Sequence, residues 1–396
     1  MTRTIQTVFS EFLARGLLWL RVLVLGALMP LDAYGLVLVY LGIEGMLAAS
    51  TSYPFVKDVL VRQDLKPALY LRFVVFFALI AVPAALAMMH LGDVGPSVAG
   101  VLLAAAFLNG LSQIALYVLR VADVRAHNRA KIIWSVLTTL LFLGLLPLNW
   151  VWLPIVYLTG ALTALVAARR AVTTSEVGSA QEADFAHHLR GWLIYGTQAL
   201  MLSLPQHGMR LVVAATMTLA DVARFTQVYM LATALFFVYS AIMISVEAQL
   251  SRAATPDQIR GRFRKASGIS ALLVAIAVVH YGVLLVFNAL GITDALLGLS
   301  LHADAALLAI LVAFTALSGL RVVANALALA ASGRSFSLFA TFLGALTLGV
   351  GLVIFMSAFG LAGVGLAMAL GQAVEVAVLF LFVLIATRGS IRTGSN

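Results

Sequence analysis

Four arginines lie inside long apolar stretches of the sequence, namely Arg15, Arg21, Arg210 and Arg321. A charged side chain at the centre of a bilayer costs about 2.5–3.5 kcal/mol even on a lenient scale, so such residues normally face protein or a water-filled cavity. A guanidinium group offers several N–H donors in a planar fork that fits phosphate and carboxylate groups. These arginines therefore indicate binding of an anion, and Arg120 and Arg224 are two further candidates.

A structural interpretation stays open for some of these arginines. Arg15 can extend its charge to the inner membrane surface. Arg21 and Arg210 can form buried ion pairs, and Arg224 can anchor the chain at the outer interface. The candidate counter-ions are Glu44, Glu375 and Glu247. Because the cations outnumber these carboxylates, a cavity that contains them would carry net positive charge.

Polar side chains recur three, four and seven residues apart within the apolar stretches, which places them on shared helix faces. Such stripes indicate either hydrogen bonds between packed helices or the lining of a polar cavity, and taken together they favour the cavity. The expected lining residues are Glu44, Tyr40, Asn109, Gln113, Tyr117, Gln206, His207, Tyr229, Thr233 and Asn325.

Sequence motifs for enzymatic chemistry are missing. The chain has no Walker A sequence, no Gly-x-Ser-x-Gly and no His/Glu metal motif. It also has no cysteine, which excludes disulfides and thiolate metal sites. We expect no catalytic residue, no metal and no cofactor, and therefore not an enzyme.

The composition is that of a protein embedded in a membrane. Hydrophobic residues make up 63% of the 396 residues and charged residues only 10%, against about 25% charged in soluble domains. Since one span needs roughly 20 mostly apolar residues, the sequence predicts twelve transmembrane helices. Their approximate ranges are 8–29, 35–53, 69–90, 97–119, 132–148, 150–168, 191–217, 222–246, 267–290, 305–331, 335–357 and 361–386.

The charges of the connecting segments predict the orientation. Most of the 25 Lys and Arg residues fall in segments that share one side if both termini are cytoplasmic, and Asp residues dominate the opposite loops. Cytoplasmic loops carry an excess of Lys and Arg. We therefore expect a multi-pass protein of the bacterial cytoplasmic membrane with both termini inside.

An internal repeat predicts the domain organisation. Residues 21–40 and 210–229 align without a gap at an offset of 189 residues (210 − 21), which pairs Arg21 with Arg210. The first two spans thus match the seventh and eighth in the same orientation, as in transporters built from parallel repeats. The expected lobes are residues 1–170 and 190–396, joined by a polar cytoplasmic linker at 171–189 and enclosing a central cavity.

The sequence resembles the polysaccharide (Wzx-type) flippases of the multidrug/oligosaccharidyl-lipid/polysaccharide exporter superfamily. The resemblance rests on twelve spans in two lobes, on the Pro30–Gly35 start of the second span and on the Phe359–Gly365 start of the last. It implies alternating access through a cationic cavity, which would carry a polyprenyl-pyrophosphate-linked oligosaccharide to the outer leaflet for O-antigen or exopolysaccharide synthesis. The implied partners are this glycan, membrane lipids, a coupling ion (H+ or Na+) and a polysaccharide polymerase, with no nucleic acid.

Two other functions compete with the flippase interpretation. The first is a drug or metabolite antiporter of the same superfamily or of the major facilitator fold, although extrusion of cations would need more buried carboxylates. The second is a membrane glycosyltransferase or ligase, which would need a large outer loop with catalytic groups, whereas all outer loops here are short.

Overall fold

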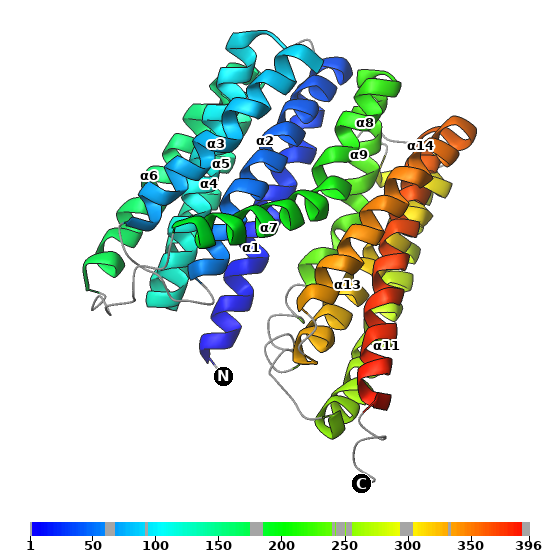
Figure 1. Ribbon diagram of the computed structural model, residues 1–396. Helices are drawn as coiled ribbons and strands as arrows, with labels where there is room; N and C mark the ends of the chain where they lie inside the picture. The colour runs from blue at the N-terminus through cyan, green and yellow to red at the C-terminus, as the bar shows by residue number, and fades with distance from the viewer. Residues whose placement is uncertain are drawn as a thin grey trace. The chain divides into compact units, whose positions relative to one another are not determined.

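The structure is a computed structural model that describes residues 2–59, 68–91, 94–174, 185–239, 256–293, 304–331 and 334–389, together with residues 242 and 250. All regular elements within these ranges are helical (Figure 1). Those up to residue 174 are α1 (Thr2–Leu28), α2 (Leu31–Lys57), α3 (Ala68–Leu91), α4 (Pro96–Ala122), α5 (Val124–Leu145), the short 3₁₀ helix η2 (Trp150–Trp152) and α6 (Leu153–Thr174). The later ones are α7 (Phe185–Ser203), the π-helical turn η3 (Leu204–Gly208), α8 (Met209–Thr216), α9 (Leu219–Thr233), α11 (Pro256–Ala289), α13 (Ala305–Ala330) and α14 (Arg334–Gly389).

The helices have the length and composition of membrane spans. Eight helical stretches among the described residues are long and apolar enough to cross a bilayer. A helix suits this solvent because it satisfies its backbone hydrogen bonds internally. The expected class of all-helical, multi-pass membrane protein is confirmed, while the count of twelve spans and the internal repeat stay predictions.

Polar residues at the helix ends show why the elements start where they do. The Asp123 side chain accepts hydrogen bonds from the backbone N–H groups of Arg125 and Ala126 at the start of α5. Thr218 and Asp221 form a reciprocal capping box at the start of α9. Such caps satisfy backbone donors that the first helical turn leaves without a partner.

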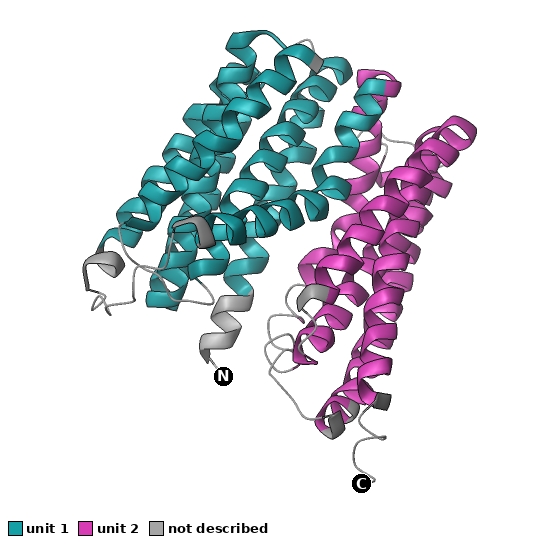
Figure 2. Ribbon diagram, in the orientation of Figure 1, with its two compact units in different colours: residues 1–215 teal, residues 216–396 magenta. Residues whose placement is uncertain are grey.

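The chain divides into two compact units, residues 1–215 (unit 1) and 216–396 (unit 2) (Figure 2). Helices α7 and α8, which cover the predicted seventh span, therefore belong to unit 1. The prediction of lobes that end at residue 170 and begin at residue 190 stays a prediction, and much of its linker lies outside the described residues.

The core of unit 1 surrounds α2, which packs against α3, α4 and α7. An aromatic cluster fills the space between these helices. Phe55 lies 5.5 Å from Phe73 and 4.8 Å from Trp192, measured between ring centroids. Gly196 of α7 allows close packing here, since a Cβ atom at this position would lie 2.8 Å from the backbone oxygen of Ser50.

The core of unit 2 lies between α13 and its neighbours α9, α11 and α14. The two halves of α14 approach closely at Gly344 and Gly371, where a Cβ atom on either residue would meet the other's backbone oxygen at 2.9 Å or less. Small residues at a helix interface permit this close approach, which supports helix association in a membrane.

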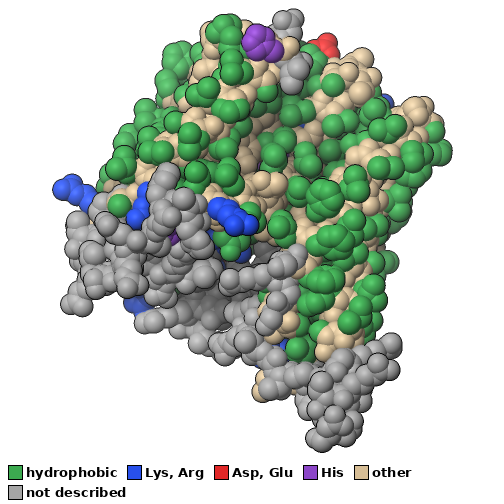
Figure 3. Space-filling model, in the orientation of Figure 1, with side chains coloured by type: hydrophobic (Ala, Val, Ile, Leu, Met, Phe, Trp, Pro, Cys, Tyr) green, Lys and Arg blue, Asp and Glu red, His purple; other side chains and the backbone are tan. Residues whose placement is uncertain are grey.

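Apolar side chains cover most of the described surface that faces the viewer in Figure 3. In α3 and in α11, only 17% of an apolar stretch of 18 residues is buried inside the protein. Because large exposed apolar areas are rare on soluble proteins, we assign the outer faces of α3 and α11 to contact with lipid tails.

Helix α14 is two helices joined at Gly360, where the backbone adopts φ +56° and ψ −131°. This break separates the predicted spans 335–357 and 361–386. A side chain at such a φ is strained by about 1–3 kcal/mol.

We expect Gly360→Ala to lower the free energy of unfolding by that amount, measured by thermal unfolding in detergent. Gly349→Ala is the matched control, because Gly349 lies in the same helix without an unusual φ and has open space at the Cβ position. Equal stability of the two variants would contradict this role of Gly360.

Candidate functional site

The candidate site in unit 1 is built around the buried carboxylate of Glu44 on α2, which is 2% exposed. The Asn109 amide on α4 donates to Glu44 Oε1 at 2.7 Å, and the Tyr157 hydroxyl on α6 donates to Oε2 at 3.0 Å. Both carboxylate oxygens are thus held by neutral donors from two other helices. The structure therefore brings together Glu44 and Asn109 from the predicted set and adds Tyr157.

Arg21 on α1 is the cation of this site. Its guanidinium carbon lies 4.4 Å from the centre of the Phe142 ring, and its charge acts on Glu44 and Tyr157. The Nε and Nη1 atoms of Arg21 are buried and find no hydrogen-bond acceptor among the described residues. Because a buried donor without an acceptor costs about 1–3 kcal/mol, these N–H groups are suited to receive an anionic group.

The candidate site in unit 2 is built around Glu375 of α14, which is 7% exposed. The Thr341 hydroxyl donates to Glu375 Oε1 at 2.8 Å, and the Gln372 amide donates to Oε2 at 3.3 Å. Arg321 Nη1 on α13 lies 3.6 Å from Glu375 Oε1. The Nε atom of Arg321 is buried and also lacks an acceptor in the described ranges.

The two sites share one chemical pattern. In each unit a buried glutamate accepts hydrogen bonds from a side-chain amide and from a hydroxyl, and an arginine lies on a neighbouring helix. The 189-residue offset does not relate them, because it pairs Glu44 with Thr233. The sequence predicts Glu44 and Glu375 as counter-ions, which stays a prediction, and it does not predict this shared set of donors.

Arg210 lies on α8 in unit 1 and is 8% exposed. Its side chain packs against α2, since a Cβ atom at Gly42 would lie 3.6 Å from Arg210 Cβ. The ring of His207 packs against Gly45 in the same way, and its Nδ1 atom is buried without a partner among the described residues. Gln206, in contrast, is exposed.

These residues lie at or directly after η3, which contains Pro205. Single π-helical turns within longer helices occur frequently at functional sites. That Arg21, Arg210 and Arg321 face one central cavity stays a prediction.

The other candidate arginines each have an identified contact. Arg15 Nε lies 3.3 Å from Glu11 Oε2, and Arg120 lies 5.8 Å from the centre of the Tyr117 ring. Arg224 Nε donates to Asp304 Oδ2 at 2.7 Å. This last pair fits the interpretation of Arg224 as a structural anchor.

The remaining residues predicted to line a cavity make local contacts. Tyr40 packs its ring on Trp150 at 4.5 Å, and Tyr229 lies 6.0 Å from Phe225. The other contacts are Gln113 Nε2 to Asn109 Oδ1 at 3.5 Å, Thr233 Oγ1 to the Tyr229 backbone oxygen at 2.7 Å, and Ser337 Oγ to Asn325 Oδ1 at 2.6 Å. Glu247 lies outside the described residues. The role of these side chains in lining a cavity stays a prediction.

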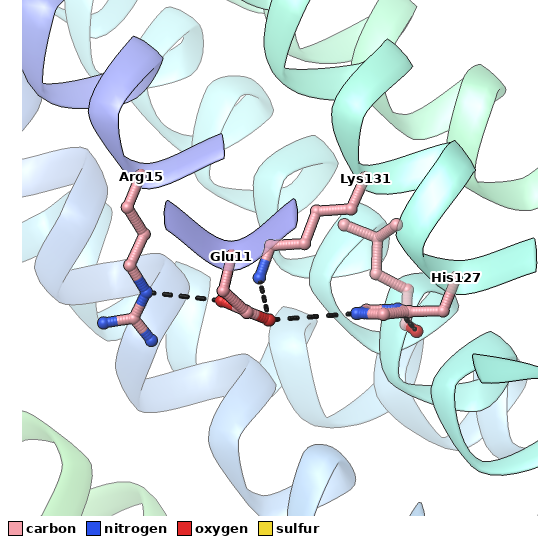
Figure 4. Close-up of polar contacts among 5 residues, drawn as sticks. Glu11, Arg15, His127 and Lys131 are labelled. Carbon is pink, nitrogen blue, oxygen red and sulfur yellow. Dashed lines mark hydrogen bonds and ion pairs between the residues drawn. The ribbon is translucent and has the colours of Figure 1, made fainter. Parts of the chain in front are cut away.

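A second charged cluster in unit 1 was not predicted (Figure 4). Glu11 on α1 is 4% exposed, and it lies between Arg15 of its own helix and two residues of α5. Lys131 Nζ donates to Glu11 Oε1 at 2.5 Å, and His127 Nε2 lies 3.9 Å from the same oxygen. The spacing of four residues in Glu11–Arg15 and in His127–Lys131 was the available signal, since residues four apart are neighbours on a helix.

Asp58 at the end of α2 holds α7 by a further buried hydrogen bond. The indole N–H of Trp192 donates to Asp58 Oδ2 at 2.7 Å. A hydrogen bond to a charged group contributes about 1.5–3 kcal/mol.

We expect Trp192→Phe to lower the free energy of unfolding by about this amount, measured by thermal unfolding in detergent. Trp134→Phe is the control, because Trp134 is also buried but its N–H has no acceptor among the described residues. A loss of stability that is no larger for Trp192→Phe than for Trp134→Phe would show that the Asp58 contact does not hold α7.

Within the described ranges, no three His, Asp or Glu side chains lie together in a way that could hold a metal ion. Arginine, carboxylate, amide and hydroxyl groups can bind an anionic group and exchange a proton.

No protein-family model and no curated protein sequence matches this chain. Solved structures do match its fold. The bent form of VcmN, a MATE transporter of Vibrio cholerae, matches with a TM-score of 0.62 at 15% identity, covering 98% of this chain and 97% of that one. An inward-facing multidrug resistance MATE transporter of the MOP superfamily gives 0.60 at 17% identity, with 99% and 96% covered. The eukaryotic MATE transporter AtDTX14 gives 0.58 at 14% identity, with 98% and 96% covered.

The chain therefore has the fold of the MATE transporters. At 14–17% identity this likeness shows the fold alone, and the predicted exporter superfamily stays a prediction. The finer resemblance to the Wzx-type flippases is not tested by this likeness.

Proposed function

We propose that this chain is a secondary transporter, an ion-coupled antiporter that exports acidic drug-like molecules or metabolites. One observation carries the proposal. Each unit holds an arginine with at least one buried N–H group that lacks an acceptor among the described residues, beside a carboxylate that accepts hydrogen bonds from neutral donors. The fold comparisons support the transporter class, since the proteins with this fold are transporters.

The charges favour an acidic cargo. Glu44 and Glu375 are the carboxylates of the two sites, and each lies beside an arginine. A cationic drug would need a carboxylate whose charge is not already offset in this way. An acidic group can instead accept hydrogen bonds from Arg21 or Arg321, with the bidentate geometry that arginine provides.

The two glutamates take a complementary role in this proposal. When cargo has left, Glu44 and Glu375 offset the charge of Arg21 and Arg321. This matters because a buried charge that loses its only partner costs about 3–5 kcal/mol. The empty carrier can thus return without an uncompensated arginine inside the membrane.

A second candidate is the flippase for polyprenyl-pyrophosphate-linked oligosaccharides. The planar donor groups of Arg21 and Arg321 favour it, because they suit a pyrophosphate as well as a carboxylate. In that case the lipid tail stays in the bilayer while the arginines replace the water around the pyrophosphate. The predicted polymerase partner and the bacterial cytoplasmic location belong to this candidate.

Proteoliposomes with a pH gradient distinguish the two. The probes are an acidic fluorophore, its uncharged methyl ester, a basic analogue and a fluorescent polyprenyl-pyrophosphate disaccharide. We expect protein-dependent movement of the acidic fluorophore but not of the ester. Movement of the disaccharide lipid alone would establish the flippase, and preferred movement of the basic analogue would overturn the anionic cargo.

A further inference from the structure

The charged cluster of Glu11, Arg15, His127 and Lys131 is the strongest feature that the proposed function does not use. It joins α1 to α5 within unit 1, and Glu11 is the only acidic member (Figure 4). Glu11 and His127 are both buried, at 4% and 3% exposed. Imidazole is the side chain best suited to bind and release a proton.

The orientation of the His127 ring is fixed by the backbone. Its Nδ1 atom donates to the backbone oxygen of Leu116 on α4 at 2.8 Å. The remaining nitrogen, Nε2, therefore faces Glu11 at 3.9 Å, and it has no hydrogen-bond partner in the described ranges. In the neutral ring, the lone pair of Nε2 points toward a carboxylate. In the protonated ring, an N–H group points toward it.

We propose that His127 is the site that takes up and releases the coupling proton of this transporter. Binding a proton converts Nε2 from an acceptor into a donor, which forms a charge-assisted hydrogen bond to Glu11 Oε1 when the present distance of 3.9 Å shortens. The inference rests on the proposed function for its role in transport. The proton site itself rests only on the geometry of the cluster.

The surrounding side chains select a proton over a metal cation. Arg15 and Lys131 both contact Glu11, and Arg120 on α4 also acts on Lys131. On α6, which packs against α5, the charged side chain that the structure describes near this end is Arg169, which is exposed. These cations oppose any added positive charge, but a proton forms a covalent bond to the imidazole lone pair, whereas Na+ needs several oxygen ligands and the four side chains offer only those of Glu11.

Helix α1 connects this cluster to the anion site. Glu11 and Arg21 lie ten residues apart on α1, which is about 15 Å along a helix. Protonated His127 adds a bond that holds α1 against α5. In this proposal, cargo that binds at Arg21 displaces α1, so that proton and cargo bind alternately.

The first test needs no cargo and measures hydrogen exchange of the α1 backbone amides in the full-length protein, corrected for the intrinsic effect of pH. We expect exchange about fivefold or more slower near pH 5.5 than near pH 7.5, the effect of one such hydrogen bond. In His127→Asn this pH difference should vanish, while the Asn amide can still donate to Leu116. His280→Asn is the matched control, because His280 Nε2 also contacts a backbone oxygen, that of Leu231 at 3.0 Å.

An unchanged pH difference in His127→Asn, or its loss in His280→Asn, would overturn the assignment of the proton site to His127.

The second test adds the acidic fluorophore to purified protein and records the release or uptake of protons in a weakly buffered solution. We expect proton release from the unmodified protein and from His280→Asn, but not from His127→Asn. Proton uptake would overturn the antiport coupling. Absence of any transport by the unmodified protein would count against the proposed function, and hydrogen exchange would still decide the proton site.

Discussion

Glu44→Leu is expected to destabilise unit 1 by several kcal/mol, because each of two buried donors left without an acceptor costs about 1–3 kcal/mol. The substitution leaves Arg21 without its carboxylate and leaves the donors of Asn109 and Tyr157 without an acceptor. The measurement is the unfolding temperature and the yield of monodisperse protein in detergent.

Glu44→Gln is the control for this prediction. Its side-chain oxygen still accepts one of the two hydrogen bonds, and its volume is nearly unchanged. We expect Glu44→Gln to fold and to lie between the unmodified protein and Glu44→Leu in stability. A leucine variant as stable as the unmodified protein would show that Glu44 does not organise this site.

Arg21→Ala and Arg321→Ala are each expected to slow transport of the acidic cargo roughly 10- to 100-fold. This range follows from the loss of one charge-assisted hydrogen bond of about 1.5–3 kcal/mol. Lysine at either position should restore only part of the activity, because a single ammonium group lacks the planar fork. Initial rates in proteoliposomes, at equal amounts of reconstituted protein, provide the measurement.

Arg129→Ala is the control, since Arg129 is an exposed cation on α5. It should transport at the normal rate. Full activity of Arg21→Ala and Arg321→Ala would show that neither arginine binds the cargo and that both have only a structural role.

The helical membrane fold was predictable because long apolar stretches in a bilayer have few alternatives to a helix. Pro30 and the residues around Gly360 marked where helices begin, and the structure has a helix start and a break there. The unit boundary at residue 215 was not foreseen. It depends on the packing of α7 against α2, through Gly196 and the Asp58–Trp192 bond.

The candidate site was predictable in its charged residues and not in their partners. Arginine and glutamate inside apolar stretches are conspicuous, so Arg21, Glu44 and Arg321 could be named as candidates. Tyr157, Thr341 and Gln372 are common types in membrane helices, and only the fold shows that they donate to the two glutamates. Glu11 and Lys131 were missed as a pair because 120 residues separate them in sequence.

Binding of an acidic amphiphile and of its uncharged methyl ester to the purified protein tests the anionic cargo most directly. We expect the acid to bind at least about tenfold more tightly than the ester, and we expect Arg21→Gln and Arg321→Gln to bring the two affinities together. Equal affinities for acid and ester in the unmodified protein, with no change in either variant, would contradict the account.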